Sequence, residues 1–172
     1  VLASTEAKSP AQTGVPPGIF QDTVFHSVKL TSDIVYGSNF NHFFDTEDTL
    51  TLDTYEPDTA LDYKRPLLIY CHGGGFTSGD KTTDKAKVFG DYFSKCGYLV
   101  ASINYRLMKD NLLDTIDNYQ GVYQATQDAK SAVRFFKQYA NNYCVDTNAI
   151  FLIGTSAGAS ICLTAAYWNQ PE

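Results

Sequence analysis

Residues 149–158 read Ala-Ile-Phe-Leu-Ile-Gly-Thr-Ser-Ala-Gly, and this stretch decides the fold. The apolar run 149–153 is typical of a strand buried on both faces of a parallel sheet. The residues that follow Ser156 predict a helix over 157–168, with small side chains near its start. A serine between such a strand and helix occupies a tight, strained turn with its hydroxyl projecting outward. The G-x-S-x-G pattern also arises by chance, so its strand–turn–helix context is what makes Ser156 a candidate nucleophile.

The chain upstream alternates between the same two kinds of element. Continuous apolar runs indicate buried strands, and apolar residues at helical spacing indicate helices packed on them. Gly97 is expected to end the first of these helices as a C-terminal cap. The expected elements are an early strand or hairpin at 23–36, a strand at 49–55, a strand at 67–71, a helix at 84–96, a strand at 98–103 and a helix at 122–140.

This order of elements predicts an α/β fold, with a mostly parallel sheet and helices on both faces. In such sheets the reactive groups lie just beyond the carboxyl ends of the strands. Residues 1–22, rich in Ser, Thr, Ala, Pro and Gly, are expected to form an extended N-terminal arm. Residues 23–172 are expected to form the domain.

The composition is that of a soluble globular protein, with 44% hydrophobic and 19% charged residues. The net charge of −6 argues against nucleic acid or an anionic membrane surface as a partner, because both require basic patches. No apolar run approaches the ~20 residues of a membrane span. The chain starts at Val1 without a visible leader, so the compartment stays open, and export with a signal peptide already removed is compatible with it.

A second motif, His72-Gly73-Gly74-Gly75-Phe76, directly follows the run 67–71. Acyl transfer creates a negatively charged oxygen that fixed backbone N–H groups stabilise, and successive glycines let the backbone approach it. Gly73 and Gly74 are the predicted donors, with the Ala157 N–H as a third. A phosphate-binding loop is disfavoured because neither Gly-Lys-Ser/Thr nor G-x-G-x-x-G is present.

The histidines and cysteines suggest no further chemistry. His72 precedes the glycines and is interpreted as a support of their loop, whereas His26 and His42 are expected to be ordinary polar residues. None of the four cysteines forms a C-x-x-C pair, so neither a zinc site nor thioredoxin-type chemistry is expected. A Cys96–Cys144 disulfide stays open.

Four blocks of the sequence together resemble the carboxylesterase-type α/β-hydrolases. The resemblance runs from about Leu50 to Trp168, and the blocks occur in the family's order. They are His72–Phe76 followed by Ser78-Gly79-Asp80-Lys81, Gly97-Tyr98 through 102–107 (Ser-Ile-Asn-Tyr-Arg-Leu), 128–134 (Asp-Ala-Lys-Ser-Ala-Val-Arg) and 154–158.

The resemblance implies a serine esterase that acts on small or short-acyl esters without a metal or cofactor, and sometimes on acetylated or feruloylated plant polysaccharides. Ser156 matches the nucleophile that becomes acylated, and the oxyanion donors match Gly73, Gly74 and Ala157. The residues expected to support the site are His72, Gly75, Tyr105, Arg106, Gly154 and Gly158.

The sequence departs from the family after the nucleophile. The fold expects an Asp or Glu and then a His after the serine, but the sixteen residues after Ser156 contain neither His nor Asp, and Glu172 is the last. We therefore predict a fold that is incomplete on its C-terminal side. The triad base and acid are expected on a C-terminal fragment of the same hydrolase, bound as a second chain. A truncated or non-catalytic hydrolase-fold protein and a peptidase on the same fold are the alternatives.

Overall fold

A five-stranded mixed sheet with strand order β1-β2-β4-β3-β5 runs through the part of the chain that the computed structural model describes, residues 18–61, 63–109 and 115–168. Three helices accompany it. In chain order the elements are β1 (Val28–Asn41), β2 (Thr46–Pro57), β3 (Arg65–Cys71), α1 (Asp84–Lys95), β4 (Leu99–Ile103), α2 (Thr115–Gln138), β5 (Val145–Gly154) and α3 (Ala157–Tyr167). The expected elements are all present, and most ends lie within about five residues of the prediction; the helix expected at 122–140 instead begins at Thr115.

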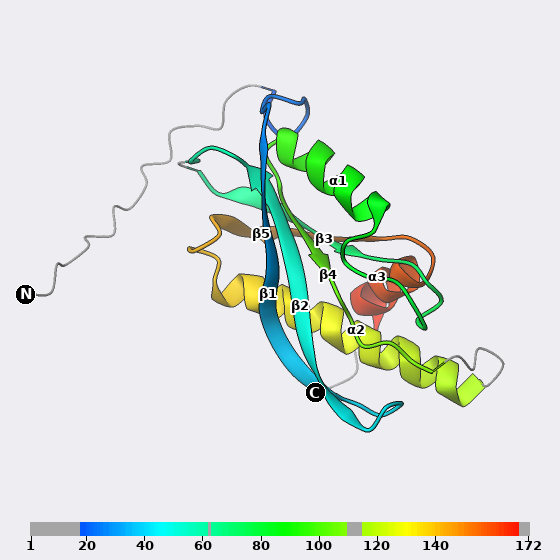
Figure 1. The fold of residues 1–172 in the computed structure, drawn as a ribbon. Helices are drawn as coiled ribbons and strands as arrows, with labels where there is room; N and C mark the ends of the chain where they lie inside the picture. Colours follow the sequence, from blue (N-terminus) through cyan, green and yellow to red (C-terminus); the bar gives the residue numbers. More distant parts are fainter. Residues whose placement is uncertain (1–17, 62, 110–114, 169–172) are drawn as a thin grey trace, which may run out of the picture.

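The central strand β3 is parallel to both of its neighbours, β4 and β5, whereas β2 is antiparallel to β4 and to β1. Four strands therefore run in one direction and β2 runs against them. Figure 1 shows the sheet twisting from a near-vertical β1 to a near-horizontal β5. The α/β prediction is confirmed, and the sheet is parallel in the half that carries the two motifs.

Helices cover both faces of the sheet, with α1 on one face and α2 and α3 on the other (Figure 1). Alternate side chains of β3 divide between the two layers, since successive residues of a strand point to opposite faces. Ile69 belongs to the larger cluster with Phe136 of α2 and Ile161 of α3, whereas Leu68 packs with Phe93 of α1. Both faces of β3 are buried, as its continuous apolar sequence predicts.

The C-terminus of α1 has the predicted glycine cap. Gly97 adopts a left-handed φ of 98°, which favours glycine because it has no Cβ. Its N–H donates to the Ser94 carbonyl at 2.8 Å, and the Tyr98 N–H donates to the Phe93 carbonyl at 3.0 Å. These two bonds form a Schellman motif that ends the helix and turns the chain into β4.

Packed structure begins earlier than residue 23. Residues 18–22 form a turn in which the Phe20 N–H donates to the Cys96 carbonyl at 2.8 Å and Ile19 is buried. The Phe20 ring also contacts the Tyr98 ring edge-on. The boundary expected after residue 22 is therefore too late, while residues 1–17 of the expected arm lie outside the described residues.

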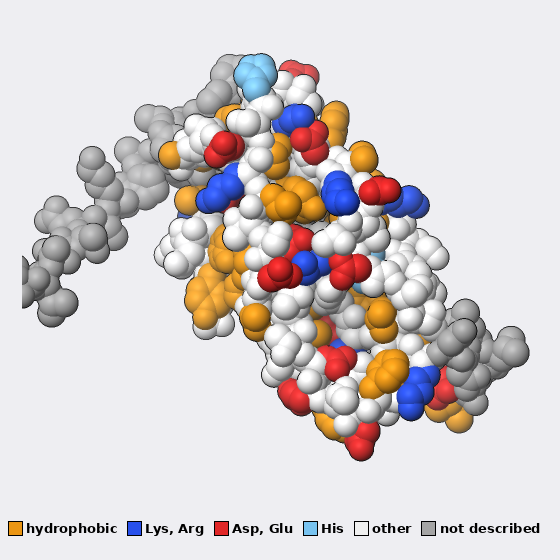
Figure 2. Space-filling view, in the orientation of Figure 1, with side chains coloured by type: hydrophobic (Ala, Val, Ile, Leu, Met, Phe, Trp, Pro, Cys, Tyr) orange, Lys and Arg blue, Asp and Glu red, His pale blue; other side chains and the backbone are white. Residues whose placement is uncertain are grey.

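β5 is the outer strand on the parallel side of the sheet. Its run 149–153 is therefore only partly covered, and the Phe151 side chain is 51% exposed. At the opposite edge, the surface in Figure 2 shows Lys and Arg side chains lying beside Asp and Glu, with hydrophobic side chains between them. The uncovered apolar surface on β5 thus lies beside the strand end that carries the serine motif.

The four cysteines are free thiols, so the Cys96–Cys144 disulfide left open by the sequence is not formed. Cys71, at the end of β3, is fully buried as expected of a small hydrophobic residue. Cys162 of α3 is only partly buried, and the proximity of the two thiols raises the pKa of Cys71 and lowers that of Cys162. This contact joins α3 to the strand beneath it.

Candidate active site

Ser156 occupies the turn between β5 and α3, where the motif predicts a strained nucleophile. Its backbone has φ 54° and ψ −119°, a conformation that non-glycine residues rarely adopt. Such strain costs about 1–3 kcal/mol and persists only when the surroundings impose it. The Ser156 residue is exposed, so its hydroxyl is accessible to a substrate.

Two glycines allow this turn because the backbones of β3, β5 and α3 meet without space for side chains. A Cβ on Gly154 would overlap the backbone of Gly158, and a Cβ on Gly158 would overlap the carbonyl of Cys71. The first turn of α3 therefore rests directly on the end of β3 as well as on β5. The support role predicted for both glycines agrees with this geometry.

The structure brings the second motif next to the first. A Cβ on Gly73 would lie 2.9 Å from the Thr155 carbonyl oxygen and 3.4 Å from the Ser156 Cβ, so Gly73 is the point of contact between the two loops. Gly74 and Gly75 have φ of 129° and 62°, left-handed values that favour glycine. Gly73 and Ser156, which are 83 positions apart in the sequence, thus meet in one site at the carboxyl ends of β3 and β5.

Two side-chain hydrogen bonds orient the peptide planes of this loop. The Tyr105 hydroxyl donates to the His72 carbonyl at 2.8 Å, and His72 Nδ1 bonds the Gly73 carbonyl at 2.8 Å. In a trans peptide the C=O and the next N–H point in opposite directions. Because Tyr105 holds the His72 carbonyl, the Gly73 N–H of the same peptide points away from Tyr105. Because the His72 ring holds the Gly73 carbonyl, the Gly74 N–H points away from that ring.

The backbone N–H groups of Gly73, Gly74 and Ala157 are among those at this point for which no acceptor is recorded within the described residues. Ala157 is the first residue of α3, whose N-terminus has no side-chain cap. The partial positive charge of a helix N-terminus favours an anion there. The site therefore presents free donors beside an exposed serine hydroxyl.

His72 is enclosed beneath the loop and is only 1% exposed. Its ring stacks on Tyr105 with a centroid distance of 4.3 Å. Burial lowers the pKa of His72, although the bond to the Gly73 carbonyl opposes this effect. A neutral imidazole that donates from Nδ1 to a carbonyl fits a supporting role, and burial also raises the pKa of Tyr105 well above its ordinary value, which keeps its hydroxyl protonated as a donor.

Arg106 forms a buried ion pair with Asp128 of α2, a partner that the sequence reasoning did not assign. Its Nη2 lies 2.8 Å from Asp128 Oδ1, and its backbone N–H donates to Asp128 Oδ2 at 2.9 Å. Nη1 also donates to the Phe40 carbonyl at 2.6 Å. The pair fixes the segment after β4, and with it Tyr105, against α2.

Lys81 was likewise missed as a support of the loop. It is 5% exposed, and its Nζ lies 2.7 Å from Asp53 and 2.9 Å from Asp33. Its carbonyl accepts from the Ser102 hydroxyl at 2.7 Å. The available signal was an aspartate within the apolar alternation of 49–55, since a buried carboxylate requires a partner.

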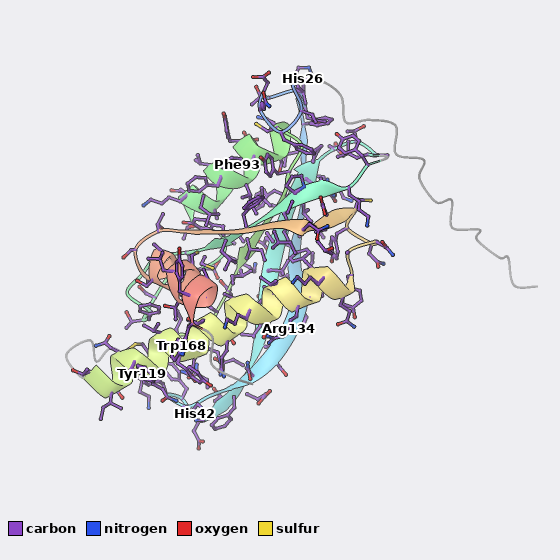
Figure 3. All side chains as sticks on the ribbon, turned by 180° about the vertical axis from the view of Figure 1, so that it is seen from behind. His26, His42, Phe93, Tyr119, Arg134 and Trp168 are labelled. Atoms are coloured by element: carbon purple, nitrogen blue, oxygen red, sulfur yellow. The ribbon has the colours of Figure 1, made fainter. Side chains whose placement is uncertain are left out.

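His26 and His42 lie far from the candidate site. Figure 3 shows His26 and His42 at opposite ends of the molecule, away from α3. Both are exposed, as expected of ordinary polar residues. Within residues 18–61, 63–109 and 115–168, no cluster of three His, Cys, Asp or Glu side chains could hold a metal ion. No helix in those ranges is long and apolar enough to cross a membrane.

Comparisons with known proteins agree with this arrangement. The BD-FAE family model matches residues 52–172. Gut esterase 1 of Caenorhabditis briggsae is 34% identical over 119 residues, which cover 66% of this chain and 20% of that protein.

Two solved structures of Thermogutta terrifontis esterase 2 are also similar. The enzyme phosphonylated by cyclosarin has a TM-score of 0.60 at 26% identity, and the match covers 77% of this chain and 45% of that chain. The propionate-bound form has a TM-score of 0.59 at 26% identity, with coverage of 86% and 45%. The chain thus spans about a fifth of the gut esterase and less than half of this esterase. With its family match, its mixed sheet and its helices on both faces, the chain belongs to the BD-FAE family and has a carboxylesterase-type α/β-hydrolase fold.

Proposed function

We propose that these residues form the nucleophile and oxyanion half of a serine carboxylesterase. The observation that carries the proposal is the strained, exposed Ser156 beside Gly73, in a site where the backbone N–H groups of Gly73, Gly74 and Ala157 have no recorded acceptor. The Ser156 Oγ attacks the ester carbonyl carbon, and the resulting oxyanion accepts from Gly73, Gly74 and Ala157. Collapse of this intermediate expels the alcohol and leaves an acyl-enzyme, which water hydrolyses.

The proton of Ser156 requires a base that the described residues do not offer near the serine. His72 is enclosed and engaged with Gly73, and His26 and His42 lie at the ends of the molecule (Figure 3). We therefore assign the base and the acid to a C-terminal segment of the same hydrolase. That segment would bring a His to Ser156 and an Asp or Glu to the His, in the order usual for this fold.

The uncovered surface beside β5 is where such a segment would dock. Phe151 of β5 and Leu163 and Tyr167 of α3 are 51%, 62% and 83% exposed. A groove of about 430 Å³, lined by residues that include Val133, Ile150 and Cys162, lies between α2, β5 and α3. A further strand parallel to β5 would cover both the apolar side chains and the free strand edge.

The substrate class is a small ester with a short acyl chain. The similar esterase 2 is solved with propionate bound, and its phosphonylation by cyclosarin is the covalent chemistry expected of an activated serine.

Covalent labelling of Ser156 tests the catalytic proposal. In the assembly that contains the C-terminal segment, a fluorophosphonate probe should label Ser156, and p-nitrophenyl butyrate should be hydrolysed. Ser156→Ala should abolish both signals, and Ser160→Ala, which alters an exposed serine one turn along α3, should change neither. Turnover that survives Ser156→Ala would exclude the proposal, and a comparison with the matching anilide would detect a peptidase instead.

Association through the β5 surface is tested separately. Leu163→Asp places a charge on the exposed face of α3 without disturbing the core, so it should weaken the co-purification of a C-terminal fragment and lower activity. Val88→Asp, at a similarly exposed apolar position on α1, is the matched control. Intact mass of the wild-type sample should show two species, and a single species near 19.0 kDa would contradict the two-chain arrangement.

A further inference from the structure

We propose that Tyr70 and Thr155 form a positioning pair that fixes the nucleophile turn against the oxyanion strand. Their hydroxyl oxygens lie 3.2 Å apart. Tyr70 belongs to β3, and Thr155 directly precedes Ser156. This role rests on the proposed esterase function and adds two residues to its machinery.

The Tyr70 side chain is held firmly in place. It is fully buried at 0% exposure, and its ring lies 5.5 Å from the Phe89 ring of α1. A buried tyrosine hydroxyl requires a hydrogen-bond partner, and Thr155 Oγ1 is the partner present. The hydroxyl of Tyr70 is therefore a fixed point to which the turn is attached.

Thr155 lies where the two halves of the site meet. A Cβ on Gly73 would lie 2.9 Å from the Thr155 carbonyl oxygen and 3.4 Å from Thr155 Oγ1. Thr155 is therefore a residue of the serine turn that lies directly against Gly73. Tyr70 lies in β3, three residues before Gly73, which follows the end of that strand. The Tyr70–Thr155 bond thus sets the position of the nucleophile relative to the oxyanion donors.

The sheet itself does not fix this relation. Pairing between β3 and β5 ends at Cys71 and Gly154. Beyond that pair, the hydrogen bond recorded between the serine turn and β3 in the described chain joins the Tyr70 and Thr155 hydroxyls, either of which can be the donor. Ser156 has strained dihedrals. Without this bond, the turn is expected to relax toward a less strained backbone conformation, which would move the Ser156 hydroxyl from its position for attack.

Loss of the bond should reduce kcat and leave KM nearly unchanged. Neither hydroxyl is expected to touch the substrate, whereas small displacements of a nucleophile reduce the rate of attack. A neutral hydrogen bond corresponds to a rate change of about three- to tenfold. Tyr70→Phe and Thr155→Val should each lower kcat by that factor, with KM within about twofold of wild type.

A double-mutant cycle in the active assembly, measured with p-nitrophenyl butyrate, tests the pairing. The double variant should be no slower than either single variant, because both remove the same bond. Thr155→Ser keeps the hydroxyl and should keep most of the activity. Tyr98→Phe is the matched control, since it removes a tyrosine hydroxyl on the same face of the sheet that bonds the distant Phe20 carbonyl.

The outcomes separate the two proposals. Losses in kcat that multiply in the double variant, an equal loss in Tyr98→Phe, or unchanged kcat in Tyr70→Phe would each overturn the positioning role alone. A wild-type assembly that neither turns over the ester nor reacts at Ser156 would overturn the proposed function and this role with it.

Discussion

Replacing Tyr105 with phenylalanine removes one oxygen atom from beneath the candidate oxyanion loop. That oxygen donates to the His72 carbonyl at 2.8 Å and lies in a fully enclosed position, since Tyr105 is 3% exposed and His72 is 1% exposed. The ring remains and can still stack on His72. The substitution therefore tests the orientation of the Gly73 N–H with little change in packing.

Two effects of different size are expected. A buried carbonyl left without its donor costs about 1–3 kcal/mol of folding free energy, which lowers the melting temperature by roughly 2–4 °C per kcal/mol in a domain of this size. Removing a whole oxyanion donor costs about 10²–10³ in kcat. Tyr105→Phe leaves the Gly73 N–H in place but frees its peptide plane, so a loss of about 10–100-fold is expected.

The assay compares kcat, KM and thermal unfolding of Tyr105→Phe with those of wild type in the active assembly. Tyr36→Phe is the control, because its buried hydroxyl donates at 2.6 Å to the carbonyl of Asn104, outside the oxyanion loop. Both variants should lose similar stability, and only Tyr105→Phe should lose more than about tenfold in kcat. Equal losses of kcat in the two variants, or a change confined to KM, would refute the peptide-plane reasoning.

Three further predictions concern stability. Asp128→Asn leaves the buried Arg106 guanidinium without its charge partner and should cost about 3–5 kcal/mol in urea unfolding, whereas Lys87→Gln, at an exposed pair on α1, should cost less than about 1 kcal/mol. Gly158→Ala should prevent soluble expression, because its Cβ would overlap the Cys71 carbonyl; Ala159→Gly is the paired control and should stay soluble. The pKa of His72 is depressed in the folded state, so the unfolded chain binds more protons as the pH falls. The free energy of unfolding should therefore be highest above about pH 6.5 and decrease below it. His72→Gln should flatten this dependence in unfolding curves measured between pH 7 and 5.

The fold was predictable because local sequence and tertiary position agree. The apolar run 67–71 is buried on both faces in the structure, and Gly97 ends its helix with the left-handed conformation that the sequence suggests. The direction of β2 was not predictable in this way. Its alternating sequence fits a strand of either direction, and only its pairing with β1 and β4 makes it antiparallel.

The two motifs of the site were predictable, and their supports mostly were not. Glycines and a serine at fixed spacing indicate a particular backbone geometry. The sequence therefore predicted that Gly73 and Ser156 belong to the same site. Lys81, Asp128 and Tyr70 act through partners from distant elements, and no local pattern specifies such a partner. A charged residue at an otherwise apolar position, such as Asp53, is the one signal that burial and pairing leave in the sequence.

The contacts that impose strain on Ser156 all come from β3, β5 and α3. Gly154 and Gly158 close the turn, the Cys71 carbonyl supports the first turn of α3, and Thr155 is bound by Tyr70. None of these contacts involves the uncovered surface beside β5. We therefore expect Ser156 to have its attack conformation before the proposed C-terminal segment binds. Binding of that segment would add the base that accepts the serine proton and would leave the serine conformation unchanged. In the proposed enzyme, the strain would belong to the half with the serine, and the base would belong to the proposed C-terminal segment.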